Sequence, residues 1–224
     1  MKQRFLCFGC LTVVTVAIGC GDVTEGLPQG DVGASSAALG GVVTTTAISV
    51  VTCSEVSAIM FSVDTTAPGS VSPGETFSIG VTFHMLPAVA PPYGGTFDGS
   101  ATLGLTRASP STTTLPFDAF HFSAGTPLTN FGASSSTVTA SSALGHPIEV
   151  RLSNFDYTIS PDTTTFNPVD AHCVADPTRD LLVTIPIVLE PASKDDCKQG
   201  GYKCHTDDQG RVFKNQGQCI NYVN

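Results

Sequence analysis

The chain has 224 residues, of which 41% are hydrophobic and only 13% are charged; its formal net charge is −9 and its pI is near 4.7. An acidic surface of this kind does not neutralise phosphates, which argues against nucleic-acid binding and against strong electrostatic attraction to anionic lipid. Few charged residues and many Thr, Ser, Gly and Pro disfavour solvated helices and favour strands and turns.

The N-terminal segment is typical of an export signal. Lys2 and Arg4 precede an uncharged, largely apolar run over residues 6–19. That run is short for a membrane span but fits the hydrophobic core of a signal peptide. It ends in the sequence VAIGC at residues 16–20, which resembles the lipobox of bacterial lipoproteins.

The resemblance implies cleavage before Cys20 and a diacylglycerol on its sulfur, often with a further acyl chain such as palmitate on its amino group. Each buried methylene contributes roughly 0.8 kcal/mol and one chain alone binds only marginally, so two or three chains on Cys20 would hold the protein durably. The alternatives are an ordinary secretory signal with Cys20 merely nearby, and a retained transmembrane helix.

Residues 20–41 follow as the lipidated cysteine and a flexible tether, because the Gly- and Ser-rich stretch after Cys20 has neither helical nor strand periodicity. A coil of this length has a root-mean-square reach of roughly 25 Å. We therefore expect a domain held clear of the membrane surface.

Residues 42–191 show short apolar segments separated by turn residues, which predicts strands. The clearest is 76–85, where apolar and polar residues alternate. Similar alternation occurs at 59–63, 101–105 and 148–152. The composition of 42–52 and 181–189 predicts strands covered on both sides. Residues 115–122 and 154–159 are two more candidate strands. The apolar phase shifts near Asn154, which predicts a bulge or turn there.

Seven to nine strands of this kind predict an all-β fold, an antiparallel β-sandwich of immunoglobulin-like or similar type. The segment 67–77 is similar to a strand-entry segment of many secreted immunoglobulin-like domains. The chain has no Trp, so the core tryptophan of antibody domains is absent and a jelly roll is an alternative.

Residues 192–224 form a separate hydrophilic, cysteine-containing module. The module contains Asp196-Cys197, Gly200-Gly201-Tyr202 and the sequence FKNQGQC at 213–219. Together they resemble a C-terminal motif of many secreted bacterial proteins of unknown function. The resemblance implies export and a stapled C-terminal element, with Cys197 paired to Cys219, and it implies no activity.

Five cysteines remain after the signal peptide and Cys20 are set aside, so one is left over. The preferred pairing joins Cys53 to Cys173 as well as Cys197 to Cys219, although Cys197–Cys204 and Cys204–Cys219 stay open. Cys204, beside His205 and Asp207, is then a possible free or intermolecular thiol. Disulfides presuppose an oxidising compartment.

No catalytic or metal-binding pattern emerges, so we expect a non-enzymatic protein without a cofactor. The chain lacks the Gly-x-Ser-x-Gly elbow of common hydrolases. The five histidines (His84, His121, His146, His172 and His205) have no metal-ligand spacing, although His84 and His121 could meet on a sheet face. Oxygens at Asp156, Asp162, Asn167 and Asp170 could bind calcium, but acidic turn residues explain them equally well.

The stretch LPAVAPPYGGTF at residues 86–97 is a possible recognition loop presenting Tyr93 and Phe97, or a lid over one end of the sandwich. The sequence therefore favours a lipid-anchored protein exposed at the periplasmic face or the cell surface, which binds or scaffolds a protein or glycan. Two alternatives are a hydrolase of envelope polymer with acids such as Asp118, Asp156 or Glu149, and a purely structural envelope component contacting through Cys204.

Overall fold

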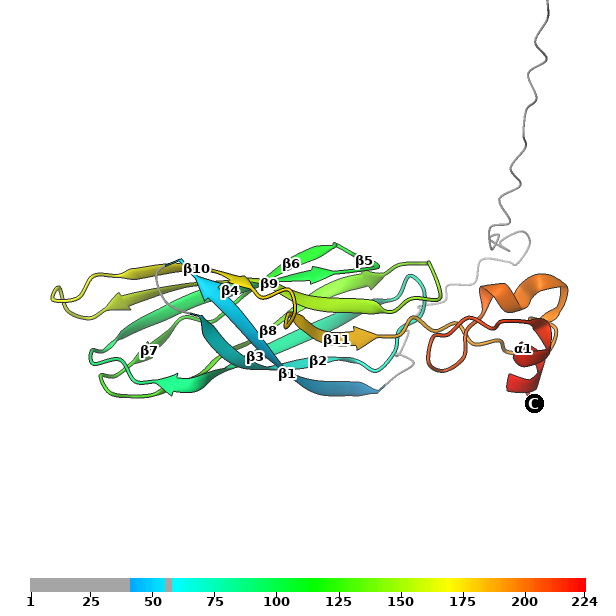
Figure 1. Ribbon diagram of the computed structural model, residues 1–224, viewed down its shortest axis with the longest axis horizontal. Helices are drawn as coiled ribbons and strands as arrows, with labels where there is room; N and C mark the ends of the chain where they lie inside the picture. Colours follow the sequence, from blue (N-terminus) through cyan, green and yellow to red (C-terminus); the bar gives the residue numbers. More distant parts are fainter. Residues whose placement is uncertain (1–40, 55–57) are drawn as a thin grey trace, which may run out of the picture. The chain divides into compact units, whose positions relative to one another are not determined.

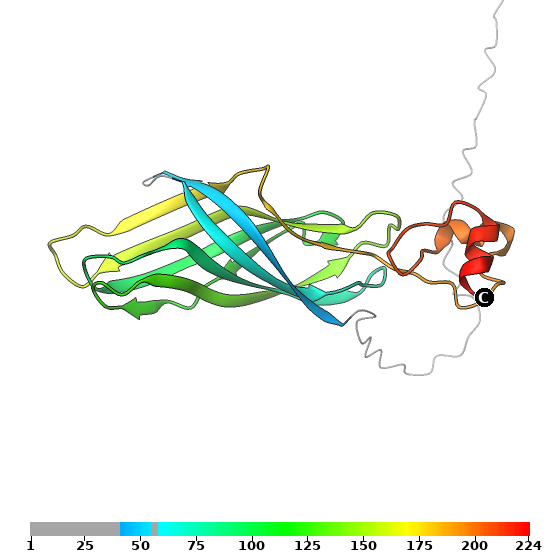
Figure 2. The same cartoon turned by 60° about the horizontal axis from the view of Figure 1, so that its bottom comes forward.

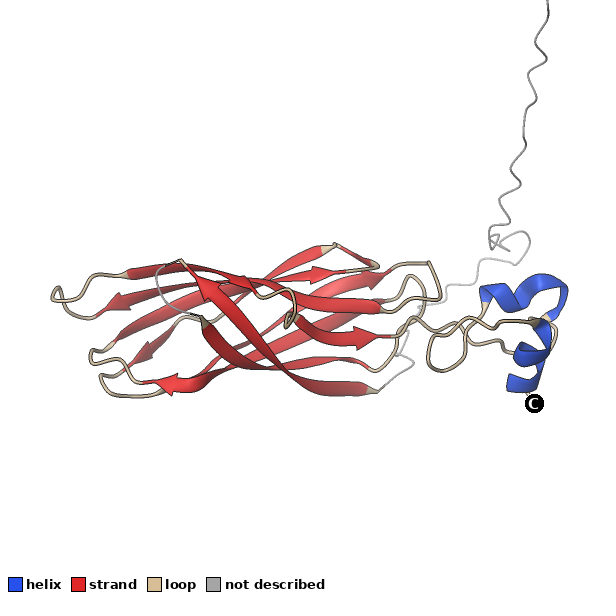
Figure 3. Ribbon diagram, in the orientation of Figure 1, coloured by secondary structure: helices blue, strands red, loops and turns tan. Residues whose placement is uncertain are grey.

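The computed structural model describes residues 41–54 and 58–224. Its strands are β1 (Val42–Cys53), β2 (Ile59–Pro68), β3 (Thr76–Val89), β4 (Gly95–Leu105), β5 (Ala108–Ser109), β6 (Thr112–Pro116), β7 (Phe120–Phe122), β8 (Leu128–Ala140), β9 (Ile148–Pro161), β10 (Val169–Ala175) and β11 (Leu181–Ile185). The helical segments η1 (Lys198–Cys204) and α1 (Gln216–Tyr222) both lie in the C-terminal module (Figure 3).

The strands form an antiparallel all-β sandwich, as the sequence predicts. They follow one hydrogen-bonded path, β5-β8-β3-β2-β1-β10-β9-β4-β6, with β11 on β9 and β7 on β4. β1 pairs with β2 from Val42 to Val51, and its last residues pair with β10. β1 therefore runs diagonally from the layer that contains β2, β3 and β8 to the layer that contains β10, β9 and β4 (Figures 1 and 2).

The interior is filled by aromatic rings from both layers. Phe61, Phe83, Phe131 and Phe155 are each at most 1% exposed, and the Phe155 centroid lies 4.7 Å from that of Phe61 and 5.3 Å from that of Phe83. These residues occupy alternate, inward-facing positions of their strands, which is the pattern that buries one face. A cluster of phenylalanines thus occupies the core of a chain without Trp.

Two details of the strands bear on the sequence predictions. The register of β9 against β4 shifts between Leu152 and Asn154, which confirms the bulge expected from the change of apolar phase. The prediction that β1 is buried on both sides is wrong, because Val42 is 75% and Ile48 55% exposed. From Ile48 to Cys53, exposed or partly buried residues alternate with buried ones, so only one face of β1 packs on the core.

Disulfides join Cys53 to Cys173, which face each other across β1 and β10, and Cys197 to Cys219. The partners are separated by 120 and 22 residues. Such bonds persist in oxidising compartments, so they indicate a location outside the cytoplasm. Neither described helix, at seven residues each, approaches the length needed to cross a bilayer.

Candidate functional site

An apolar cavity of about 680 Å³ lies between the layers, at the end of the sandwich where β2 begins. Both layers contribute to its walls, which include Ile59, Met85, Leu128, Phe155, Ile159 and Val169. Within the described part of the chain, no charged side chain lines it. Its volume and composition are those of sites that hold apolar groups.

Tyr93 and Phe97, the residues of the expected recognition loop, both line this cavity. Tyr93 is half-buried in the connection between β3 and β4, and its ring lies 4.5 Å from that of Phe166 in the connection between β9 and β10. Phe97 is not in a loop: it lies in β4, is 1% exposed and stacks on Tyr157 at 5.7 Å. Its inward position in the strand makes it a buried wall of the cavity.

The two glycines after Tyr93 allow β4 to begin close against β9. A Cβ on Gly95 would lie 2.6 Å from the carbonyl oxygen of Ser160, and one on Gly94 would lie 2.7 Å from Asp162 Oδ2. A larger residue at Gly95 would collide with the backbone of β9, whereas one at Gly94 would require the Asp162 carboxylate to move. The glycine pair therefore fixes the position from which the Tyr93 connection departs.

Exposed apolar side chains surround the mouth of the cavity. Met60 and Leu86 face each other across β2 and β3 and are each 39% exposed, and Val89 is 51% exposed. All three belong to the cavity lining. We call Met60, Leu86 and Val89 the apolar rim; adjoining apolar surface of this kind marks interaction sites in soluble proteins.

A second hollow, a polar groove of about 490 Å³, lies over β4, β9 and β10. Asp98, Asp156, Asp170 and His172 are among its lining residues. His172 Nδ1 is hydrogen-bonded to Asp156 Oδ1, and their side chains are 61% and 41% exposed. A histidine and a carboxylate thus meet in a concave site, which is the arrangement a hydrolase would need.

Among the described residues, no serine of the groove is hydrogen-bonded to the imidazole or the carboxylate of this pair: Ser54 Oγ instead accepts from the backbone N–H of His172 at 3.4 Å. Ser100 faces Asp156 from β4, while His172 faces Asp156 from β10, so the carboxylate lies between the serine and the imidazole. A serine nucleophile must instead contact the imidazole. The other acids named for a hydrolase lie elsewhere: Glu149 pairs with Arg151 at 3.0 Å, and Asp118 is an exposed residue outside the groove.

The remaining histidines do not assemble a metal site in the described ranges. His84 does not meet His121: it bonds to Asp64 at 3.0 Å and Asn130 at 2.8 Å, whereas His121 bonds to Asp162 at 2.9 Å. No group of His, Cys, Asp or Glu among residues 41–54 and 58–224 has the geometry to hold a metal ion. The oxygens considered for calcium are divided between β9, β10 and their connection.

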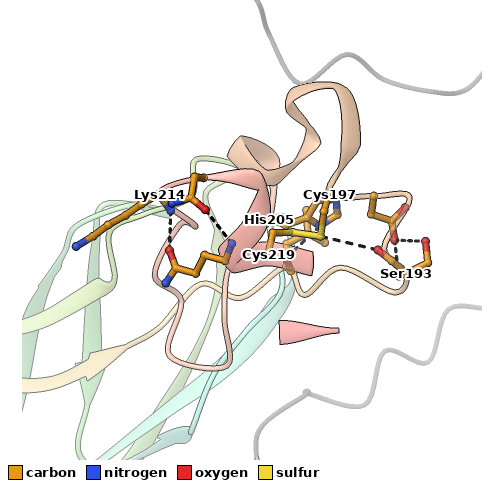
Figure 4. The surroundings of a disulfide bond; sticks show 9 residues. Ser193, Cys197, His205, Lys214 and Cys219 are labelled. Carbon is orange, nitrogen blue, oxygen red and sulfur yellow. Dashed lines mark hydrogen bonds between the residues drawn. A yellow bond between two sulfur atoms is a disulfide. The ribbon is translucent and has the colours of Figure 1, made fainter. Parts of the chain in front are cut away.

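The C-terminal motif residues have structural roles in the module of residues 192–224 (Figure 4). Asp196 accepts hydrogen bonds from the Ser193 N–H at 2.7 Å and Oγ–H at 3.2 Å, beside the Cys197–Cys219 disulfide. Gly200 has a φ of 91°, and a Cβ on Gly201 would overlap the carbonyl oxygen of Asp196. Both glycines are therefore required by the backbone.

The second half of the motif begins helix α1. Asn215 caps the helix by accepting from the Gln218 N–H at 2.8 Å, and Gln218 Oε1 accepts from the Lys214 N–H at 3.0 Å. Phe213 is 4% exposed and packs on Tyr222 with centroids 5.3 Å apart. These contacts account for the motif as a small disulfide-closed core.

Cys204 is disulfide-bonded as well. The prediction of a free thiol at Cys204 is therefore wrong. His205 beside it uses Nδ1 to bond the Leu189 carbonyl at 3.3 Å, and Asp207 accepts from Arg211 Nε at 2.8 Å, so neither is arranged with the other around an ion.

The predicted signal peptide, Cys20 and most of the tether lie outside the described residues. Comparison of the chain with protein-family models, with curated proteins and with solved structures finds no match.

Proposed function

We propose that this protein is an exported lipoprotein, anchored through acyl chains on Cys20, that binds a partner without catalysis through its apolar cavity. The observation that carries the binding proposal is the cavity of about 680 Å³ with its uncharged lining and exposed rim. Burying such surface against an apolar partner is favourable at roughly 25 cal/mol per Å².

Of the two partner classes suggested by the sequence, the lining supports protein over glycan. Sugars are held by hydrogen bonds to polar side chains, whereas the described residues of the cavity wall offer only the tyrosine hydroxyls of Tyr93 and Tyr157 besides backbone groups. Burial raises the pKa of Tyr157, so this phenol stays protonated.

Intact mass of the purified protein, combined with metabolic fatty-acid labelling, tests the anchor. The wild type should begin at Cys20 and carry acyl mass, and Cys20→Ala should lose both label and membrane association. Recovery of unlabelled wild-type protein from the medium, or a peptide map that places Cys20 in a disulfide, would contradict it.

A neutral fluorescent apolar probe, N-phenyl-1-naphthylamine, tests the cavity. Val89 and Val174 are 51% and 52% exposed, but only Val89 lines the cavity. Val89→Lys should weaken probe binding about tenfold or more by placing an ammonium at the mouth, while Val174→Lys should not. Equal effects of the two variants, or no saturable probe binding, would exclude the cavity as a binding site.

The Asp156–His172 pair favours a second candidate function, hydrolysis of envelope polymer in the polar groove. His172→Ala and Asp156→Asn, assayed for release of soluble fragments from cell-wall material, decide between the two. Fragment release that both substitutions abolish would establish the hydrolase and overturn the non-enzymatic proposal.

A further inference from the structure

We infer that the cavity and its apolar rim receive a segment of a partner protein that combines apolar side chains with Lys or Arg. The inference rests on the proposed binding function and specifies its partner.

The rim argues for a protein segment as the occupant. Met60 and Leu86 lie opposite each other on β2 and β3, at even positions whose odd neighbours, Phe61 and Met85, face the interior. Both side chains line the cavity and are also 39% exposed, so a small molecule confined to the cavity would cover them only in part. A protein segment covers the rim and inserts a side chain into the cavity, which is how anchoring residues act at interfaces.

The charge around the cavity argues for a basic segment. Three acidic residues of the polar groove adjoin cavity-lining residues along the chain: Asp98 follows Phe97, Asp156 precedes Tyr157 and Asp170 follows Val169. Successive side chains of a strand point to opposite faces, so the carboxylates lie on the outer side of the wall that the apolar residues line. At about 0.1 M salt their field extends about 10 Å, which reaches across one sheet.

Within residues 41–54 and 58–224, no Lys or Arg lines the cavity or the polar groove. The only Lys or Arg residues in the sandwich sequence are Arg107, Arg151 and Arg179, and none of them lines the cavity or the groove. Arg151 is already paired with Glu149 and Asp180. An approaching anionic segment is repelled at this end, and a cationic one is attracted.

A synthetic peptide in which Lys alternates with Leu around a single Trp tests the inference, since the chain has no Trp of its own and the peptide ring reports its burial by a blue shift. The Lys peptide should bind, more weakly at high salt, and the same peptide with Glu for Lys should bind at least about tenfold more weakly. Val89→Lys should weaken binding of the Lys peptide, as it should weaken binding of the neutral probe.

Charge variants supply the matched control. The double variant Asp98→Asn and Asp170→Asn should weaken binding of the Lys peptide roughly three- to tenfold and leave binding of the neutral probe unchanged. Asp195→Asn with Asp208→Asn removes the same charge from exposed positions of the C-terminal module, outside the groove, and should change neither. Equal affinity for Lys and Glu peptides, or no effect of the groove variant, would overturn the inference while the probe data still support the cavity.

Two further outcomes are informative. If dodecyltrimethylammonium monomers bind at least as tightly as the Lys peptide and Val89→Lys weakens them, the occupant is a small cationic amphiphile and the protein-segment inference is wrong. If neither peptide nor probe binds, the proposed function itself fails.

Discussion

The ring of Tyr93 lies against the ring of Phe166, with centroids 4.5 Å apart. Tyr93 belongs to the connection between β3 and β4, and Phe166 to the connection between β9 and β10. Tyr93 lines the cavity and Phe166, 41% exposed, supports it from outside. A contact between two connections therefore holds one of the side chains that line the cavity.

Phe166→Ala should loosen this wall. Dissociation of the neutral probe, followed by stopped-flow fluorescence, should become several-fold faster because Tyr93 loses its neighbour. The free energy of unfolding should change by about 1 kcal/mol or less, since the ring is partly in solvent. Tyr222→Ala, which removes an aromatic ring of 39% exposure from the C-terminal module, should leave the dissociation rate unchanged.

Removing the disulfide between β1 and β10 should cost more stability than removing the disulfide between Cys197 and Cys219. Replacing Cys53 and Cys173 by Ala should lower the free energy of unfolding by roughly 4–5 kcal/mol, since the bond closes a loop of 120 residues, against about 3 kcal/mol for the pair 22 residues apart. Urea titrations of the two double variants measure this. A larger loss for Cys197 and Cys219 would show that loop length does not govern the order.

Two glycines of the C-terminal motif should respond in opposite ways to alanine. Gly201→Ala places a Cβ against the Asp196 carbonyl and should destabilise the module by about 2 kcal/mol or more. Gly217, inside α1, would gain only an ordinary contact with Asn215 Oδ1, so Gly217→Ala should stabilise the helix by about 0.5–1 kcal/mol.

Hydrogen exchange of the α1 amides measures the effect of both substitutions on the stability of the module. Exchange should become faster in Gly201→Ala and slower in Gly217→Ala, while the amides of β3 and β9 stay unchanged in both. The same direction for both variants would contradict the steric argument.

His84 should make stability pH-dependent. A hydrogen bond to Asn130 and the neighbouring Asp64 raise the pKa of His84, against some desolvation. The folded state then holds the proton more tightly than the unfolded state, so the stabilisation is complete below the unfolded pKa and is lost as pH rises through the folded pKa. Both side chains are about one-third exposed, so the effect should stay below about 1 kcal/mol.

Urea titrations from about pH 5 to pH 8 test this, with His84→Gln as the comparison because other histidines also titrate in this range. Wild type should lose more stability than the variant toward pH 8. Toward acid, Asp64 acts in the opposite direction: its hydrogen bonds, first from Thr46 and then from His84, lower its pKa, so its contribution is present above the unfolded pKa and is lost as pH falls through the folded one.

The sequence predicted strands well where apolar residues alternate, as in β3, and it located the bulge of β9 from a change of phase. It missed β8 and β10. In β10 the buried positions hold Ala171, Cys173 and Ala175, and much of β8 is Ser and Thr, so the alternation is between small residues and gives little hydrophobic contrast.

The site was less accessible to sequence reasoning. The Pro-Pro-Tyr-Gly-Gly stretch indicated Tyr93, but the cavity is walled by residues more than a hundred positions apart, such as Ile59 and Val169. The contact between Asp156 and His172 depends on the register of β9 against β10, which their long connection leaves undefined in the sequence. The glycines before Phe97 are typical of a loop, whereas Gly95 begins β4 and Phe97 lies within that strand.

The course of β1 has a consequence for a molecule held by its N-terminus. Val42 pairs with Pro68 at one end of the first hairpin, whereas Val51 pairs with Ile59 beside the cavity, and a strand of twelve residues spans roughly 40 Å. The proposed attachment before Val42 and the proposed binding cavity therefore lie at opposite ends of the sandwich. Changing the length of the segment before Val42 would alter how far from the membrane a partner is met, and it would leave the strength of the encounter unchanged.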